Sequence, residues 1–103
     1  MGDLGSYFPS NDEKWRNFKS LKMLSMIYSE IKDQFTVLHL DSIVVLQKPN
    51  ISNHINEMRS KIADTIQVDL SSISIKATTT DHLGYIGKGK GIASQAIATL
   101  ILK

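Results

Sequence analysis

Apolar residues recur at the spacing of an amphipathic helix in the first third of the chain. Leu24, Ile27 and Ile31 follow one another at intervals of three or four positions, and polar residues mostly occupy the other faces. The pattern predicts a helix over Ser20–Gln34, with Ser20 as a candidate N-cap and Lys14 as an alternative start.

A second helical pattern follows in the middle of the chain. Ile55, Met58, Ile62 and Ile66 form an apolar stripe within the otherwise polar stretch Asn50–Gln67. Such a stripe is typical of a helix that packs one face on a core. The sequence therefore predicts two helices, each with one buried face.

Two other stretches have the patterns of β-strands. Thr36–Gln47 contains the continuous apolar run Ile43–Leu46, which indicates a central strand covered on both faces. Pro49 is expected to end this strand, because proline has no N–H group to donate. Ser71–Thr79 alternates between polar residues and isoleucines, which places both isoleucines on one face of a second strand.

The last segment, Gly91–Leu102, fits either a strand or an alanine-rich helix. The order of elements predicts a single α+β domain over residues 1–103, a two-layer sandwich with helices on one face of a mixed β-sheet. A sheet of two or three strands is thin. We therefore expect a further strand or a partner chain beside it.

A glycine-rich loop follows the second predicted strand, within Lys76–Gly91, KATTTDHLGYIGKGKG. Its threonine hydroxyls, lysines and flexible backbone N–H groups suit a phosphate or diphosphate. Asp81 within it could hold a hard cation that bridges phosphate oxygens. The alternative is a polar connection that uses glycine only for its turn geometry.

Composition excludes several classes of protein. The 103 residues include 42% hydrophobic residues, no cysteine and a net charge of +2 with scattered charges. A disulfide framework and a thiolate metal site are therefore excluded. Nothing demands nucleic acid as a partner. No apolar run is long enough to span a bilayer, so no membrane partner is expected.

Short motifs elsewhere carry little weight. Gly84–Gly91 nearly matches the P-loop pattern GxxxxGK[ST], but it ends in glycine where a magnesium-binding hydroxyl is needed. The start, MGDLGS, fits a myristoylation pattern without a second membrane signal. The histidines, His39, His54 and His82, do not have metal-ligand spacing.

Several motifs together resemble one known family. The stretch KATTTDHLGYIGKGKGIASQAIA is similar to the C-terminal signature of 2-C-methyl-D-erythritol 2,4-cyclodiphosphate synthases. The stretch GDLGSYFPSND resembles the family's GDIG-x-x-FPDTD loop, and LDSIVVLQKPNISNHINEMR resembles its strand, Q-x-P turn and helix. The order of these motifs is nearly colinear along the whole chain.

This resemblance implies an enzyme of isoprenoid precursor synthesis. In that reaction the 2-phosphate of 4-diphosphocytidyl-2-C-methyl-D-erythritol 2-phosphate attacks the β-phosphorus, which releases CMP and leaves a cyclic diphosphate. The family implies a homotrimer with active sites between subunits, zinc in the full-length protein, and magnesium or manganese at the diphosphate. It also implies the bacterial cytoplasm or a plastid-type stroma.

The resemblance assigns roles to matching residues. Thr79 matches the threonine that polarises the phosphate, and Asp81 matches the ligand of the second metal, where the family usually has glutamate. Nucleotide contacts are implied for Leu46, Gln47, Lys48, Pro49, Asn50, Ile51, Ser52, Ala77, Thr78, Thr79 and Thr80. Substrate contacts are implied for Asp3, Leu4, Gly5, Phe8, Pro9, Ser10, Asn11, Asp12, Tyr85 and Lys88.

The chain also departs from the family pattern. Ser10 stands where the family has aspartate, and Lys88 stands where it often has a phosphate-binding arginine, which loses a bidentate contact. Family members carry zinc ligands in a segment ahead of GDLG, and these zinc ligands are absent from this chain. We therefore expect the 103-residue form alone to be inactive. The alternatives are a degenerate cytidine-nucleotide-binding or trimer-forming module without catalysis, and a small nucleic-acid binder.

Overall fold

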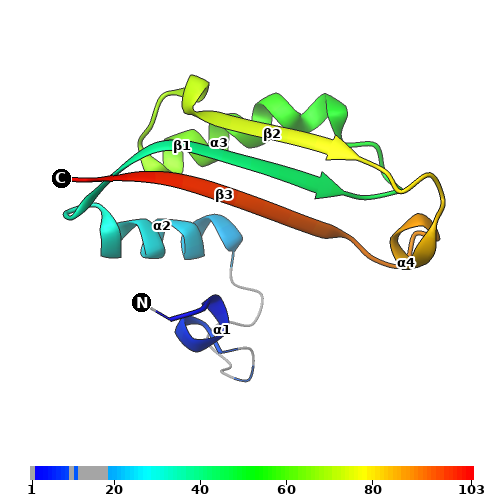
Figure 1. Cartoon of the computed structure of the whole chain (residues 1–103), viewed down its shortest axis with the longest axis horizontal. Helices are drawn as coiled ribbons and strands as arrows, with labels where there is room; N and C mark the ends of the chain where they lie inside the picture. Colours follow the sequence, from blue (N-terminus) through cyan, green and yellow to red (C-terminus); the bar gives the residue numbers. More distant parts are fainter. Residues whose placement is uncertain (1, 10, 12–18) are drawn as a thin grey trace.

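The chain is built around a three-stranded mixed sheet in the order β2-β1-β3, seen in a computed structural model that describes residues 2–9, 11 and 19–103 (Figure 1). Strand β1 (Phe35–Val45) lies in the middle, parallel to β2 (Ile73–Thr78) and antiparallel to β3 (Ala93–Leu102). The α+β two-layer sandwich predicted from the sequence is confirmed, and the ambiguous last segment is a strand.

Helices α2 (Ser20–Ile31) and α3 (Ile55–Ile66) pack on one face of the sheet. Apolar side chains from both helices meet the alternate residues Ile73 and Ile75 of β2, and Val37 and Leu40 of β1, whose alternation is interrupted by a register shift between Val37 and His39. The most buried side chain of this layer is Ile73, which is 1% exposed. Its buried core is Ala63, Ile66, Ile73 and Ile75, with Leu24, Tyr28, Val37, Leu40, Ile55, Met58, Ile62 and Val68 packed around it.

The observed ends of the elements differ slightly from the prediction. Helix α2 starts at Ser20, which is its first helical residue, so the N-cap is Lys19 instead of Ser20. A 3₁₀ turn, η2 (Ser52–His54), precedes α3. Strand β1 ends before Pro49 is reached, because its partner β2 ends at the paired position and leaves no further ladder.

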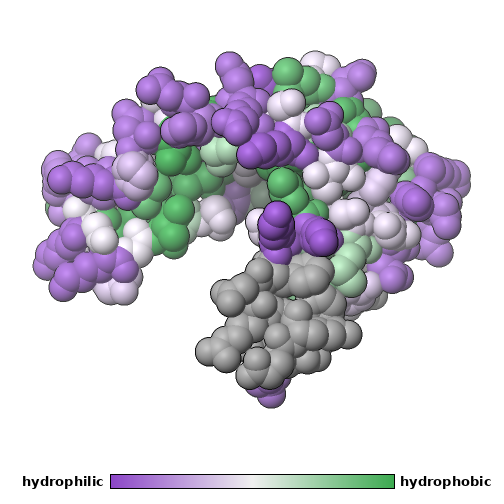
Figure 2. Space-filling view, turned by 180° about the vertical axis from the view of Figure 1, so that it is seen from behind, coloured by the Kyte–Doolittle hydropathy of each residue, from purple (hydrophilic) through white to green (hydrophobic). Residues whose placement is uncertain are grey.

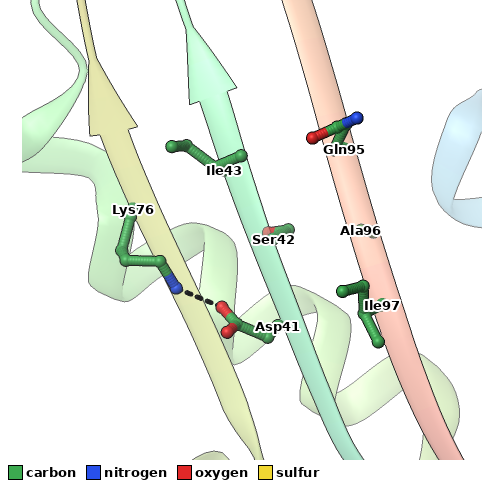
Figure 3. A pocket seen from close by; sticks show the side chains of 7 residues that line it. All are labelled: Asp41, Ser42, Ile43, Lys76, Gln95, Ala96 and Ile97. Carbon is green, nitrogen blue, oxygen red and sulfur yellow. Dashed lines mark hydrogen bonds and ion pairs between the residues drawn. The ribbon is translucent and has the colours of Figure 1, made fainter.

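The second face of the sheet is open in the described part of the chain. The central position of β1 is confirmed. The cover expected on both faces of Ile43–Leu46 stays a prediction, because in the described part of one chain Ile43 lines an open pocket on the second face. Figure 3 shows Asp41 and Lys76 forming an ion pair on this open face, beside Ile43 of the central strand. The pocket there has a volume of about 320 Å³ and is lined by Asp41, Ser42, Ile43, Lys76, Gln95, Ala96 and Ile97.

Strand β3 is an exposed edge of the sheet. All ten of its residues are exposed, including Ile97 at 73% and Leu102 at 71%. Viewed from behind, the molecule forms an arch with apolar surface on its inner side (Figure 2). Exposed edges and apolar faces of this kind are surfaces that proteins usually cover.

The start of β2 is tied to α3 by Arg59. Its guanidinium donates to the carbonyl oxygen of Ile73 at 2.7 Å and to that of Leu70 at 3.0 Å. Leu70 opens the 3₁₀ turn η3 (Leu70–Ser72), which leads directly into β2. These bonds fix the strand that ends in the threonine run.

A one-turn helix, α1 (Leu4–Tyr7), lies beside α2 (Figure 1). The hydroxyl of Tyr7 donates to Glu30 Oε1 at 2.7 Å, and this bond raises the pKa of Tyr7. Phe8, next to Tyr7, is buried at 6% exposure. The alternative helix start at Lys14 lies outside the described residues.

Candidate active site

The ends of β1 and β2 lie side by side and bring two predicted segments together. Val45 pairs with Thr78, and the backbone N–H of Leu46 donates to the carbonyl oxygen of Thr78 at 3.0 Å. Both strands run in the same direction, so both segments leave the sheet at the same end (Figure 1). Ligands of open sheets that contain parallel strands commonly bind at this end.

Three threonine hydroxyls line the turn that follows β2, and each has a different role. Thr80 Oγ1 donates to the carbonyl oxygen of Leu83 at 2.7 Å, and Thr78 Oγ1 makes a longer bond of 3.3 Å to the carbonyl oxygen of Thr79. Thr79 Oγ1 accepts from the backbone N–H of Asp81 at 3.2 Å. Because this oxygen acts as an acceptor there, the exposed hydroxyl of Thr79 can still donate its own proton to another group.

The backbone of the turn adopts an uncommon conformation. Asp81 and His82 have φ angles of 53° and 65°, and Gly84 follows at 69°. Residues with a Cβ rarely adopt this left-handed backbone conformation, and they keep it only when the surrounding structure holds them there. The turn is therefore held by specific contacts instead of local preference.

A one-turn helix, α4 (Gly84–Gly87), closes the turn and was not predicted by the glycine-rich pattern. A Cβ added at Gly87 would lie 2.3 Å from the carbonyl carbon of His82 and 2.6 Å from Thr80 Oγ1. Glycine at this buried position lets α4 pack directly on the threonine turn. The position of Gly87 among the glycines of the loop is the feature of the sequence that could have predicted this contact.

Two residues near α4 extend the site toward solvent. Tyr85 is 67% exposed and its ring lies against Gly91, where an added Cβ would be 2.5 Å from Cε1. Lys88 is exposed at the end of the helix and adds positive charge near the threonine turn. Backbone N–H groups, one free hydroxyl donor and positive charge form a set that suits an anion such as a phosphate.

Asp81 is the acid that could hold a metal ion in this turn. Its side chain is exposed and lies in the same turn as the hydroxyls of Thr79 and Thr80. Magnesium is commonly bound through one or two carboxylates together with the phosphates of a ligand, so a single carboxylate fits this use. A closed zinc site needs more ligands, and the described residues contain no group of three or more His, Cys, Asp or Glu that could hold one.

The rest of the predicted nucleotide-binding segment continues from β1 toward η2. Lys48, Pro49 and Asn50 are exposed, and the Lys48–Pro49 peptide bond is cis. Asn50 Oδ1 accepts from the backbone N–H of Ser52 at 2.9 Å, which fixes the turn before the helix. Ile51 lies between them as the residue that caps η2. The segment presents backbone groups next to the threonine turn.

The N-terminal residues that we predicted to bind substrate lie elsewhere. Figure 1 shows α1 below α2, away from α4 and the threonine turn. Asp3 Oδ1 accepts from the backbone N–H of Ser6 at 2.7 Å, and this bond holds the pKa of the Asp3 carboxyl below its usual value. Leu4, Gly5, Phe8, Pro9 and Asn11 belong to the same segment, whereas Ser10 and Asp12 lie outside the described residues. Within the described part of one copy of the chain, the segment around Asp3 does not lie next to the threonine turn.

One contact in the site was missed by reading the sequence. The side-chain oxygen of Gln47 accepts from the backbone N–H of His82 at 3.1 Å. We assigned Gln47 only as part of a nucleotide-binding segment, and His82 had no assigned role. The two residues are 35 positions apart, so no local pattern indicates that they meet.

Comparisons with known proteins identify the family of this chain. A sequence model of the YgbB family matches residues 1–101. The chain is 43% identical over 102 residues to a 2-C-methyl-D-erythritol 2,4-cyclodiphosphate synthase of Alkaliphilus oremlandii and 41% identical to that of Clostridium acetobutylicum. Each match covers 98% of this chain and 65% or 66% of the relative. The chain therefore spans slightly less than two thirds of the length of these curated relatives.

Solved structures show the same fold. The bifunctional IspDF of Campylobacter jejuni superposes with a TM-score of 0.91 at 34% identity, over 96% of this chain and 27% of that one. The IspF of Plasmodium falciparum in a CDP complex superposes with a TM-score of 0.84 at 32% identity, over 100% of this chain and 62% of that one. Sequence and fold agree over the whole length of the chain, which belongs to the YgbB family.

Proposed function

We propose that the protein containing this chain is a 2-C-methyl-D-erythritol 2,4-cyclodiphosphate synthase. Its substrate is 4-diphosphocytidyl-2-C-methyl-D-erythritol 2-phosphate, and its products are the cyclic diphosphate and CMP. The observation that carries this proposal is the contact between the ends of β1 and β2. It places the threonine turn next to the Leu46–Ser52 segment, as a cytidine diphosphate requires. The structure of a similar protein holds CDP, which supports this ligand class.

The residues of the turn act by positioning and by donating hydrogen bonds. An oxygen of the 2-phosphate forms a bond to the β-phosphorus, and the bond from that phosphorus to the oxygen of CMP breaks. The transferred group carries its charge on oxygen, so fixed donors lower the barrier. The Thr79 hydroxyl donates to such an oxygen, and Lys88 adds positive charge. A divalent ion held by Asp81 would neutralise further phosphate charge when bound.

The Leu46–Ser52 segment holds the other end of the substrate. Its exposed backbone groups are suited to read a cytosine edge, while the adjacent turn receives the diphosphate. The nucleoside would then lie at the end of β1 and the reacting phosphates at the end of β2.

The site is completed by a neighbouring copy in a homotrimer. Within one chain α1 and its Asp3 loop are far from the threonine turn, so a substrate that contacts both needs a second copy (Figure 1). The open face of the sheet, with Ile97 at 73% exposure, offers apolar side chains for that assembly (Figure 3). None of the described helices is long and apolar enough to cross a membrane. The named relatives are bacterial, which supports a cytoplasmic location.

Release of CMP from the substrate tests this function. The intact gene product should turn over the substrate in the presence of a divalent ion, and its Thr79→Val variant should do so far more slowly. Binding of CDP without release of CMP would instead indicate a nucleotide-binding module. The absence of both would contradict the proposal.

A further inference from the structure

The side chain of Gln47 joins the two halves of the proposed site. Gln47 directly follows Leu46, and its side-chain Oε1 lies 3.1 Å from the backbone nitrogen of His82. An N–H group can only donate, so the oxygen of the amide must face His82. Gln47 is half-buried, whereas Lys48 and Pro49 beside it are exposed. Its side chain therefore points back toward the turn.

The turn that receives this bond needs support from outside. Asp81 and His82 both have a Cβ and a left-handed backbone, a strained conformation that the surrounding structure must hold in place. The bonds made by Thr79 and Thr80 lie within the turn itself. The bond from Gln47 comes from the end of a different strand, so it ties the strained residues to the sheet.

We infer that Gln47 is a positioning residue for diphosphate binding. Its amide oxygen holds the backbone of His82, and through it keeps the Thr79–Asp81 turn in the conformation that presents donors to the phosphates. Gln47 thus acts on the turn through its side chain, besides belonging to the nucleotide-binding segment. This inference rests on the proposed function, because it assumes that the turn binds the diphosphate of a cytidine nucleotide.

A positioning role has a specific consequence for ligand affinity. CDP and CMP carry the same nucleoside, but only CDP places a second phosphate on the turn. Loss of the Gln47 bond should therefore weaken CDP binding about five- to tenfold, the size expected for one hydrogen bond, and CMP binding less than twofold. A general loss of folding would weaken both ligands alike.

The test compares Gln47→Met with Gln47→Glu in the assembled protein. Methionine has similar length and no strong acceptor, whereas glutamate keeps an oxygen for the His82 amide. Gln34→Met is the matched control, because Gln34 is exposed at the opposite end of β1. Hydrogen exchange of the His82 amide reports the bond, and calorimetry with CDP and CMP reports its effect on binding.

We expect faster exchange at His82 only in Gln47→Met, together with a lower ratio of CDP to CMP affinity. The inference is overturned if the His82 amide of Gln47→Met exchanges at the rate of the unmodified protein. It is also overturned if the unmodified protein prefers CDP and Gln47→Met keeps the same ratio of CDP to CMP affinity. Either result leaves the proposed function intact. If the parent protein binds neither nucleotide, the proposed function itself fails, and the inference fails with it. Thermal melting of all three variants identifies any that do not fold.

Discussion

The two halves of strand β2 differ in burial and in what surrounds them. Ile73 and Ile75 in the first half are buried against the helices, and Arg59 holds the start of the strand. The second half, ending at Thr78, is exposed and leads into a turn with left-handed residues. The first half contributes to the core, and the second leads into the turn for which we propose contact with a ligand. The same strand therefore places a strained turn on a rigid base.

Replacing Ile73 by alanine should have the largest effect on stability. The side chain is 1% exposed, so its removal leaves a cavity and should cost about 3 kcal/mol of unfolding free energy. Denaturant unfolding measures this loss. The matched control is Thr78→Ala in the exposed half, which should cost less than about 1 kcal/mol. Equal losses from the two variants would remove the contrast between the halves.

Replacing Thr79 by valine should have the largest effect on catalysis. Valine keeps the shape but lacks the hydroxyl, and removal of one preorganised donor to a transition state lowers the rate by about 100-fold. CDP affinity should change much less, because the donor acts mainly on charge that develops during the reaction. Assays of CMP release and calorimetry measure the two effects. Thr79→Ser is the control and should retain most of the rate.

Replacing Gly87 by alanine should disturb the turn without touching the core. The new Cβ would lie 2.3 Å from the backbone of His82, so α4 and the turn must move apart. We expect CDP affinity to fall about tenfold, since a displaced turn no longer presents its donors. Gly2→Ala, where the nearest atom is 3.4 Å away, should bind CDP normally. Normal binding by Gly87→Ala would show that the close packing of α4 is dispensable.

The smallest effect is expected from the ion pair on the open face. Lys76 donates to Asp41 and holds the pKa of its carboxyl below the usual value. The folded pKa lies below the unfolded one, so the pair stabilises the fold above about pH 4 and the benefit is lost as the pH falls further. Unfolding measured from pH 7 to pH 3 should show a weaker decline in Asp41→Asn. Lys76→Met should have the same effect, and the double variant should add little. An unchanged decline in both would mean that the pair is screened by solvent.

Much of the fold could be predicted because its signals are periodic and local. The stripe from Ile55 to Ile66 indicated α3, and the apolar run in β1 indicated the central strand. The apolar run in β1 could not show whether this chain itself covers both faces of the strand, because a partner chain can cover one of them. The last strand was ambiguous since alanines suit both a helix and a strand.

The sequence by itself determined the two helices, the central strand, and a loop whose residue types suit a diphosphate. These features depend on spacing along the chain, which the sequence states directly. Only the tertiary structure decided that Gln47 reaches His82, that α4 packs on the turn through Gly87, and that the Asp3 loop lies apart from both. Such contacts join residues that are distant in sequence or depend on backbone angles, and neither distance nor angle is encoded by periodicity.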